Sequence, residues 1–160
     1  MLDKVPSAFG KLCVALVAIH AARPLALRSL LISDLDRAHG QLKVGTRLIY
    51  LDELTLLLIA DWLRDRHQRW PLSANPHLLV TRRTAMHAGR PPINKFAVQY
   101  YFRFTGLTAQ KIWSDRILDE AHEAKDPLHL MHVFGLSATT AVKYVQAAHP
   151  ERFIIDPTQA

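Results

Sequence analysis

The feature that most constrains the fold of this sequence is an apolar run from Leu12 to Ala22, followed by Arg23 and Pro24. Its hydrophobic residues occupy nearly every side of a helix, which predicts a buried helix over residues 11–22. Proline pushes the preceding residue out of the helical conformation and suits the first turn of a new helix. Arg23 is therefore expected at a sharp break, anchored beside the core but outside it.

The patterns after this break predict mainly helix. The expected helices cover residues 24–31, 52–69, 93–104, 109–124, 127–133 and 138–148. A compact β-hairpin is expected from strands 41–44 and 47–51 around Gly45-Thr46, with one more short strand at 77–81 and a basic loop at 82–92. The predicted fold class is mainly α with a small antiparallel hairpin (α+β), and residues 1–148 should form one domain followed by a tail, 149–160.

Composition narrows the partners and the compartment. The 160-residue chain has a net charge of +6 and a pI near 9.8, a balance that favours an acidic partner such as nucleic acid. Its apolar runs are shorter than the roughly 20 residues of a membrane-spanning helix. A single cysteine, Cys13, cannot form an internal disulfide and fits a reducing compartment. We therefore expect a cytoplasmic protein without a membrane span.

Short motifs follow one another in a fixed order along the chain. They are Ala21-Ala22-Arg23, Ile32-Ser33-Asp34-Leu35-Asp36, Trp113-Ser114-Asp115-Arg116, Phe134-Gly135-Leu136-Ser137 and Thr139-Thr140-Ala141-Val142-Lys143-Tyr144. The series resembles the motifs T-G-L-R, W-S-D-I-D, H-x-x-R, L-G-H-S and T-T-x-x-Y of the tyrosine recombinases, the family of the phage integrases. The likeness covers about residues 11–148 and implies the C-terminal catalytic domain of that family, which acts in DNA recombination and DNA integration.

This resemblance implies a chemistry and a residue for each role. Tyr144 would attack a DNA phosphate to give a 3′-phosphotyrosine, while Arg23 and Arg116 stabilise the charge on the phosphate oxygens. Lys43, the only lysine of the hairpin, would protonate the leaving 5′ oxygen, and Arg47 lies across the hairpin from it. The reaction requires no metal, and we expect no cofactor.

Departures from the family pattern in both residues and spacing leave catalysis open. Trp113 stands where H-x-x-R has histidine, and Leu136 stands where L-G-H has histidine. Between Arg116 and Gly135 the chain is also about three residues shorter than the usual pattern, nearly one helical turn, and Gly135 to Tyr144 is shorter by about one. Because one preorganised donor is typically worth on the order of 10²–10³ in rate, loss of both histidines would leave little activity.

Further basic residues are candidates for contact with double-stranded DNA. They are Arg47 in the hairpin, Arg82, Arg83 and Arg90 in the loop, and Lys143 beside Tyr144. The tail carries the apolar residues Phe153, Ile154 and Ile155. The resemblance implies that residues 149–160 could pack on a neighbouring protomer, giving a homo-oligomer.

Each candidate also has a structural interpretation. Arg23 could pair with Asp34 or Asp36, Arg116 could pair along its own helix with Asp119 or Glu120, and Tyr144 could be a core aromatic. His129 and His132 have helical spacing, but no cysteine or carboxylate completes a metal site with them.

Two alternative functions follow from the last third of the chain. Residues 127–145 resemble a helix-turn-helix, in which Thr139, Thr140 and Lys143 would face DNA in a non-catalytic regulator or accessory protein. A helical interaction domain that docks through its apolar tail is the third hypothesis.

Overall fold

A buried helix lies at the centre of the first part of the molecule, as the apolar run predicts. In the computed structural model, which describes residues 1–154, this helix is α1, Ala8–Ala18. It begins earlier than expected, because the Oγ of Ser7 caps it by accepting a hydrogen bond from the Gly10 amide at 3.1 Å, and it ends at Ala18, before the expected residue 22. Leu12, Leu16 and their neighbours have no exposed surface.

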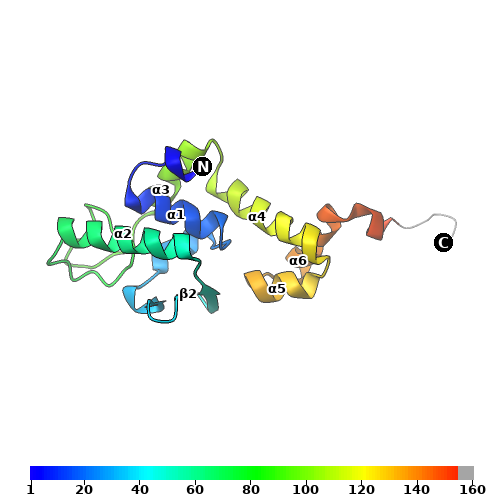
Figure 1. The fold of residues 1–160 in the computed structure, drawn as a ribbon, viewed down its shortest axis with the longest axis horizontal. Coiled ribbons are helices and arrows are strands. Elements are labelled where there is room, and N and C mark those ends of the chain that lie inside the picture. Colours follow the sequence, from blue (N-terminus) through cyan, green and yellow to red (C-terminus); the bar gives the residue numbers. More distant parts are fainter. Residues whose placement is uncertain (155–160) are drawn as a thin grey trace. The chain divides into compact units, whose positions relative to one another are not determined.

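The other elements agree largely with the sequence patterns. The further helices are α2 (Glu53–Arg69), α3 (Lys95–Tyr100), α4 (Ala109–Ala124), α5 (Pro127–Phe134) and α6 (Ala138–Ala148), and the strands are β1 (Leu35–Asp36), β2 (Gln41–Val44) and β3 (Arg47–Tyr50) (Figure 1). Short 3₁₀ helices cover Leu2–Lys4, Pro24–Ser29, Ile32–Asp34, Tyr101–Thr105 and Pro150–Phe153. The helix expected over residues 24–31 is a 3₁₀ helix that ends at Ser29. The fold is mainly helical with one small antiparallel sheet.

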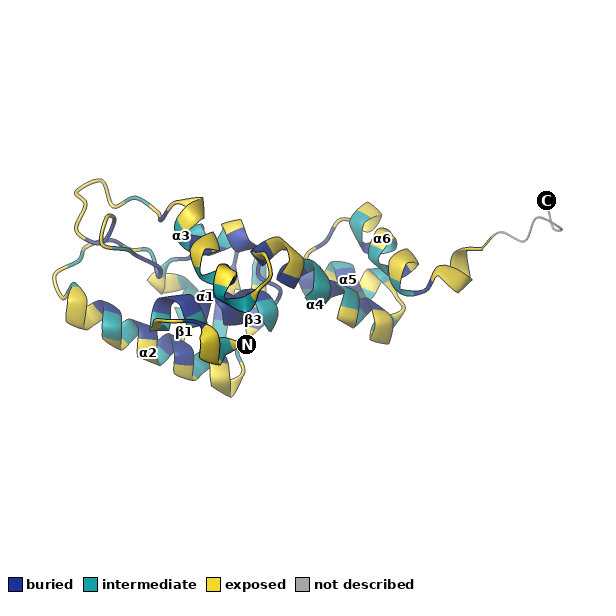
Figure 2. Ribbon diagram, turned by 90° about the horizontal axis from the view of Figure 1, so that it is seen from above, coloured by how far each residue is buried: buried dark blue, intermediate teal, exposed yellow. Residues whose placement is uncertain are grey.

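The chain divides into two compact units, residues 1–113 and residues 114–160, and the division falls inside α4. In the first unit α2 lies alongside α1 (Figure 1). One side of α2 is buried and the other is exposed (Figure 2). On the buried side Trp62 packs edge to face on Phe9, with ring centroids 5.2 Å apart, and its Nε1 donates to the Leu78 carbonyl at 2.9 Å. This contact ties α2 to the segment that follows it.

The small sheet has the order β1-β2-β3 with antiparallel pairing throughout. Leu42 lies opposite Ile49 and Val44 lies opposite Arg47, so these four residues share one face of the hairpin. Leu42, Val44 and Ile49 are buried on that face. The turn places Gly45 at φ 63°, a left-handed conformation that glycine adopts without strain.

The strand expected at residues 77–81 is wrong. His77 forms one isolated bridge with Leu31, and the following residues are buried without a strand partner. Polar side chains hold this segment instead. The Asn75 amide donates to the Thr84 carbonyl at 3.0 Å and to the Pro91 carbonyl at 2.9 Å, so it pins both ends of the basic loop.

The helix expected over 93–104 is also shorter than predicted. Asn94 caps α3, and after Tyr100 the chain continues as a 3₁₀ turn that ends at Gly106, whose φ of 76° is left-handed. This segment packs on residues of α1. Gly10 of α1 permits the contact, because a Cβ at Gly10 would come within 2.4 Å of the Tyr101 ring.

The second unit holds α5, α6 and residues 114–124 of α4. The helices α5 and α6 pack on each other, and the turn between them places Gly135 at φ 63°. Ser137 then caps α6, its Oγ accepting from the Thr140 amide at 3.3 Å. The unit's core consists of Ile117, Ala121, Leu130, Phe134, Leu136, Ala141 and Val145.

Residues 149–154 contact this second unit. His149 is buried, with its Nε2 2.9 Å from the Ala121 carbonyl oxygen, and Arg152 donates to the Lys125 carbonyl at 2.7 Å. Phe153 and Ile154 are exposed, whereas Ile155 and the rest of the tail lie outside the described residues. Docking of this tail on a neighbouring protomer stays a prediction.

Among residues 1–154 no helix is both long enough and apolar enough to cross a membrane. The same residues contain no cluster of three or more His, Cys, Asp or Glu side chains that could hold a metal ion.

Candidate functional site

Arg23 lies at the surface of the first unit, where the chain leaves α1. The exit is made by Ala21, which is fully buried and has a left-handed φ of 50°. The Ala21 amide still bonds to the Val17 carbonyl at 3.1 Å, so this turn is tied to the end of the helix. The following residue, Ala22, is also buried, and Pro24 starts the next 3₁₀ turn. The exposed Arg23 therefore projects from a backbone that is fixed on both sides.

Trp113, on α4, contacts the turn formed by residues 21–23, which we call the Arg23 corner. Its Nε1 donates to the Ala21 carbonyl at 2.9 Å, and its ring faces Arg23 with the guanidinium carbon 5.0 Å from the ring centroid. In the tyrosine-recombinase pattern this position carries histidine. Here the only side-chain donor of Trp113 is engaged by the backbone, so Trp113 orients Arg23 and does not supply the missing imidazole.

Arg47 is the second cation at this corner. It begins β3 on the same hairpin face as Val44, and its Nη2 donates to the His20 carbonyl at 2.6 Å. Burial lowers the pKa of Arg47, and the positive charge of Arg23 lowers it further. The charge of Arg23 is therefore felt at Arg47.

Hydrogen bonds to Asp52 and Thr55 keep His20 in place for this contact. The His20 Nε2 lies 3.0 Å from an Asp52 carboxylate oxygen and 3.1 Å from the Thr55 Oγ1. The Thr55 hydroxyl also donates to Asp52. Burial alone would raise the pKa of Asp52, but the hydrogen bonds from Thr55 and His20 outweigh it and hold that pKa below its ordinary value. These contacts could not be predicted from the sequence, because no local motif links residues 20, 52 and 55.

Lys43 occupies the opposite face of the hairpin from Arg47. It lies opposite Leu48 in the register and is exposed, whereas Arg47 shares the face of Leu42 and Ile49. Of the two hairpin cations, Arg47 is the one beside Arg23. Arginine is a poor proton donor near neutrality, because its pKa is ordinarily above 12.

The basic loop is exposed and well anchored. Arg82, Arg83 and Arg90 are all exposed, and Thr81 and Thr84 close a turn between them through the Thr84 Oγ1, which accepts from the Thr81 amide at 2.9 Å. Arg90 has a left-handed φ of 50°. Within residues 1–154 none of these three arginines forms an ion pair.

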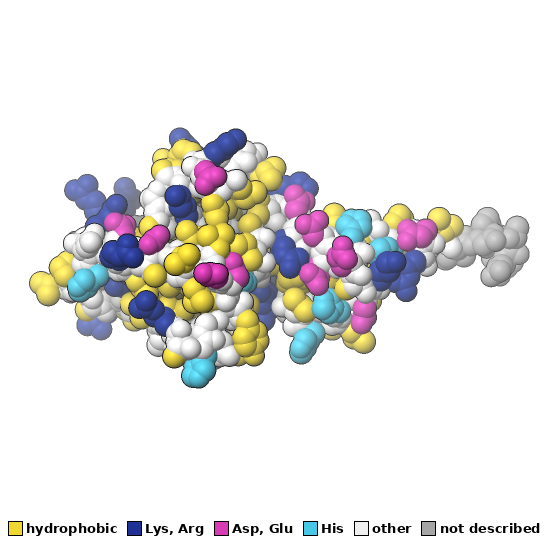
Figure 3. Space-filling model, in the orientation of Figure 1, with side chains coloured by type: hydrophobic (Ala, Val, Ile, Leu, Met, Phe, Trp, Pro, Cys, Tyr) yellow, Lys and Arg dark blue, Asp and Glu magenta, His cyan; other side chains and the backbone are white. Residues whose placement is uncertain are grey.

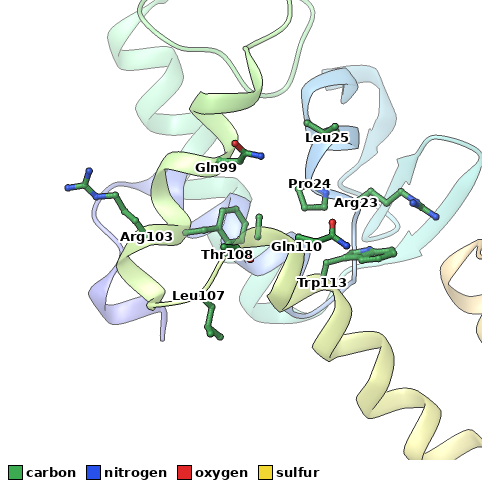
Figure 4. A pocket seen from close by; sticks show the side chains of 11 residues that line it. Arg23, Pro24, Leu25, Gln99, Arg103, Leu107, Thr108, Gln110 and Trp113 are labelled. Atoms are coloured by element: carbon green, nitrogen blue, oxygen red, sulfur yellow. The ribbon is translucent and has the colours of Figure 1, made fainter. Parts of the chain in front are cut away.

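A groove of about 550 Å³ opens beside Arg23 and Trp113 (Figure 4). Gln99, Thr108 and Gln110 contribute polar groups, and Phe102 and Leu107 contribute apolar surface. Arg23 and Arg103 stand toward its two ends and point away from each other (Figure 4). The groove joins the Arg23 corner to the segment after α3.

In the second unit Arg116 pairs with Glu120, as one of the structural interpretations predicts. Its Nη1 lies 3.1 Å from a Glu120 oxygen, and its guanidinium carbon lies 5.5 Å from the Phe134 ring centroid. His129 meets the other Glu120 oxygen at 2.8 Å. The bond from His129 holds the pKa of Glu120 below its ordinary value; burial opposes this shift and Arg116 reinforces it. Acidic and histidine side chains are interspersed on this face of residues 114–154 (Figure 3).

Tyr144 is half-buried, and its hydroxyl lies 2.9 Å from the Ser114 Oγ. Ser114 and Arg116 are two positions apart on α4, and such residues point to different sides of a helix. Leu136, at the position of the second expected histidine, is buried. The neighbouring Lys143 is exposed.

Asp34 and Asp36 have partners other than Arg23. The Asp34 carboxylate accepts from the Leu31 amide at 2.8 Å, and Asp36 bonds to His39. Arg23 forms no ion pair with any residue that the structure describes. The ion pair with Asp34 or Asp36, which was the structural interpretation of Arg23, is therefore not formed.

Comparison with known proteins supports the fold. The sequence matches no protein-family model and no curated protein. The structure is similar to the crystal structure of XerA recombinase, with a TM-score of 0.69 and 15% sequence identity. The match covers 94% of this chain and 60% of that one. The chain has a tyrosine-recombinase-like fold.

Proposed function

We propose that this chain binds double-stranded DNA as a recombinase-type domain and that Arg23 and Arg47 grip a backbone phosphate. The observation that carries this proposal is the exposed guanidinium of Arg23, which lies 5.0 Å from the Trp113 ring centroid and follows the buried Ala21 and Ala22. Its positive charge also lowers the pKa of Arg47. Two cations held together raise each other's energy, and a phosphate between them would relieve that repulsion. Arginine suits this role because its planar fork donates two parallel hydrogen bonds to phosphate oxygens.

The backbone around both residues supports this role. Arg23 follows two buried alanines, and Arg47 is tied to His20, which Asp52 and Thr55 hold. A phosphate would therefore meet groups that need little reorganisation, which is what makes such a site effective. The exposed arginines 82, 83 and 90 add charge for contacts along the DNA backbone.

The binding proposal is tested with a fluorescent DNA duplex and anisotropy at fixed salt. Arg23→Gln should weaken binding by about tenfold, because one charge-assisted contact to phosphate is lost. Arg64→Gln is the matched control, since Arg64 is an exposed arginine of the same unit that lies 3.4 Å from Asp61. Equal affinity of the Arg23→Gln variant and the control would contradict the proposal.

Cleavage through Tyr144 is the finer part of the proposal. The Tyr144 hydroxyl would give up its proton as its oxygen attacks phosphorus, the bond from phosphorus to the 5′ oxygen would break, and the leaving 5′ oxygen would take up one proton, so that protons balance over the step. Before the attack, the Tyr144 hydroxyl must break its hydrogen bond with the Ser114 hydroxyl and turn toward the phosphate. A nicked suicide substrate should trap a covalent adduct that Tyr144→Phe abolishes. Retained DNA binding without an adduct would identify a non-catalytic DNA-binding protein.

One observation favours a second candidate, a helix-turn-helix regulator. Thr139 and Lys143 are exposed on α6, while Tyr144 turns inward to Ser114. This arrangement is the one expected of a recognition helix. Lys143→Gln combined with Thr139→Ala would then reduce duplex affinity at least as strongly as Arg23→Gln.

A further inference from the structure

We propose that the aromatic and basic side chains around α3 form a second binding site, whose ligand is single-stranded nucleic acid with unpaired bases. This site, which we call the α3 face, consists of Phe96 and Tyr100 with Lys95, Arg103, Arg82 and Arg83. It goes beyond the proposed function and does not rest on it. Neither duplex binding through Arg23 nor cleavage through Tyr144 requires these aromatic rings.

Exposed aromatic rings are the first observation. Phe96 is 67% exposed and Tyr100 is 48% exposed, although both are large apolar side chains on a helix only six residues long. Their spacing of four residues puts them on one side of α3. Unpaired bases stack on such rings, whereas the bases of an intact duplex hide their flat faces from a protein.

Cations lie directly against these rings. The Lys95 ammonium is 5.3 Å from the Phe96 ring centroid, and the Arg103 guanidinium is 4.7 Å from the Tyr100 centroid and 5.1 Å from that of Phe104. The rings of Tyr100 and Phe104 also contact each other, with centroids 5.9 Å apart. Positive charge therefore lies beside aromatic surface on this face, the combination that binds a phosphate backbone with unpaired bases.

Two adjoining grooves give this face room for a strand. One, of about 430 Å³, lies between Arg82 and Arg83 on one side and Phe96 and Tyr100 on the other. The second, of about 250 Å³, shares Arg82 and Tyr100 and extends to Trp70. Together they form one path past the exposed rings.

The charge around this path favours a polyanion. From residue 66 to residue 114 the sequence has no Asp or Glu but eight Lys and Arg. Asp65, at the end of the second groove, already pairs with Arg69 at 3.1 Å. Within residues 1–154 no carboxylate forms an ion pair with any of the four cations of the α3 face. A polyanion whose bases can stack fits both the charge and the rings.

The test compares three fluorescent probes of equal length: a 12-nucleotide oligo-dT, an abasic strand with the same phosphates, and a duplex. The wild-type chain should bind oligo-dT at least about fivefold more tightly than the abasic strand, because stacking on one ring is worth that much or more. Phe96→Leu and Tyr100→Leu should remove most of this preference and leave abasic binding unchanged. Arg82→Gln combined with Arg83→Gln should weaken both single strands.

Controls separate this site from the alternatives. Tyr50→Leu, which changes an equally exposed aromatic residue on β3, should leave the preference for oligo-dT intact. Arg23→Gln should weaken duplex binding alone, so failure of one proposal would not mimic failure of the other. Equal affinity for oligo-dT and the abasic strand would overturn the inference. So would concentration-dependent dimerisation that Phe96→Leu abolishes, since the α3 face would then be an interface between two copies of the chain.

Discussion

The two compact units differ in charge as well as in fold. Residues 1–113 contain 16 Lys and Arg against 7 Asp and Glu, a net charge of +9, whereas residues 114–160 contain 4 against 7, a net charge of −3. The overall charge of +6 therefore conceals one basic unit and one acidic unit. The basic unit is the one expected to attract DNA, because long-range attraction follows the local charge.

The same contrast holds between two arginines of the recombinase-like pattern. Arg23 forms no ion pair among the described residues and stands beside a second cation, Arg47. Arg116 is paired with Glu120, which His129 also contacts. Arg116 is paired with a carboxylate of its own helix, whereas no carboxylate among the described residues pairs with Arg23. The sequence motifs assign the same role to the two arginines, but the structure gives them different surroundings.

The largest effect predicted from this comparison concerns Cys13, the only cysteine, which lies in α1 of the basic unit. Burial raises the pKa of its thiol to about 12, which removes nearly all of the reactive thiolate at pH 8. A thiol reagent should therefore label the folded protein about 10³-fold more slowly than the denatured chain. Because no other thiol exists, the labelling rate reports the opening of residues 1–113 alone. Rapid labelling of the folded protein would contradict the tightly packed core described here.

The effects of substituting the buried Trp62 and the half-buried Tyr144 should differ next in size. Trp62→Ala removes a buried ring and its bond to Leu78, and should lower the free energy of unfolding by about 3–5 kcal/mol. Tyr144→Phe removes only the hydroxyl that meets Ser114 and should cost about 1 kcal/mol. Urea denaturation measures both values, and Cys13 labelling should accelerate only for Trp62→Ala. Comparable losses from the two substitutions would weaken the distinction between the units.

The pairing of Arg116 with Glu120 predicts a smaller, pH-dependent effect. Hydrogen bonding lowers the pKa of Glu120 in the folded state, so its contribution to stability is present above the unfolded pKa and is lost as the pH falls through the folded value. At pH 7 Glu120→Gln should cost about 0.2–1 kcal/mol, since the pair is partly exposed. Below about pH 4.5 the difference should shrink toward zero. A difference that grows on acidification would contradict the ion pair.

Elements with strong local signals could be predicted from the sequence. The hairpin around Gly45, the helix that begins after Asp52 and the cap at Ser137 are all confirmed, because turn and cap residues specify these features locally. The strand at 77–81 failed for a physical reason. Its apolar residues are buried, but its only β-bridge among the described residues is Leu31–His77, and the side chains of Trp62 and Asn75 bond to the Leu78 carbonyl and the His77 amide.

The candidate site could be predicted only in part. The order of motifs points to Arg23, but its partners come from residues distant in sequence, namely Arg47 and Trp113. The strand register places Arg47 on the same hairpin face as Val44 and places Lys43 on the opposite face. A sequence motif does not specify which residues of two strands lie opposite each other. The pairing of Arg116 with Glu120 could be predicted from the sequence, because charges four residues apart on a helix are neighbours.

The most direct test of the central idea, that the basic unit grips DNA phosphate through Arg23, is the salt dependence of duplex binding. The test compares wild type with two variants. Arg23→Gln removes one exposed cation from the first unit, and Lys143→Gln removes one exposed cation from the second unit. A plot of log affinity against log salt should lose about 0.9 of its slope for Arg23→Gln, as expected for one phosphate contact, and should be unchanged for Lys143→Gln. An unchanged slope for Arg23→Gln, or a loss confined to Lys143→Gln, would contradict this account.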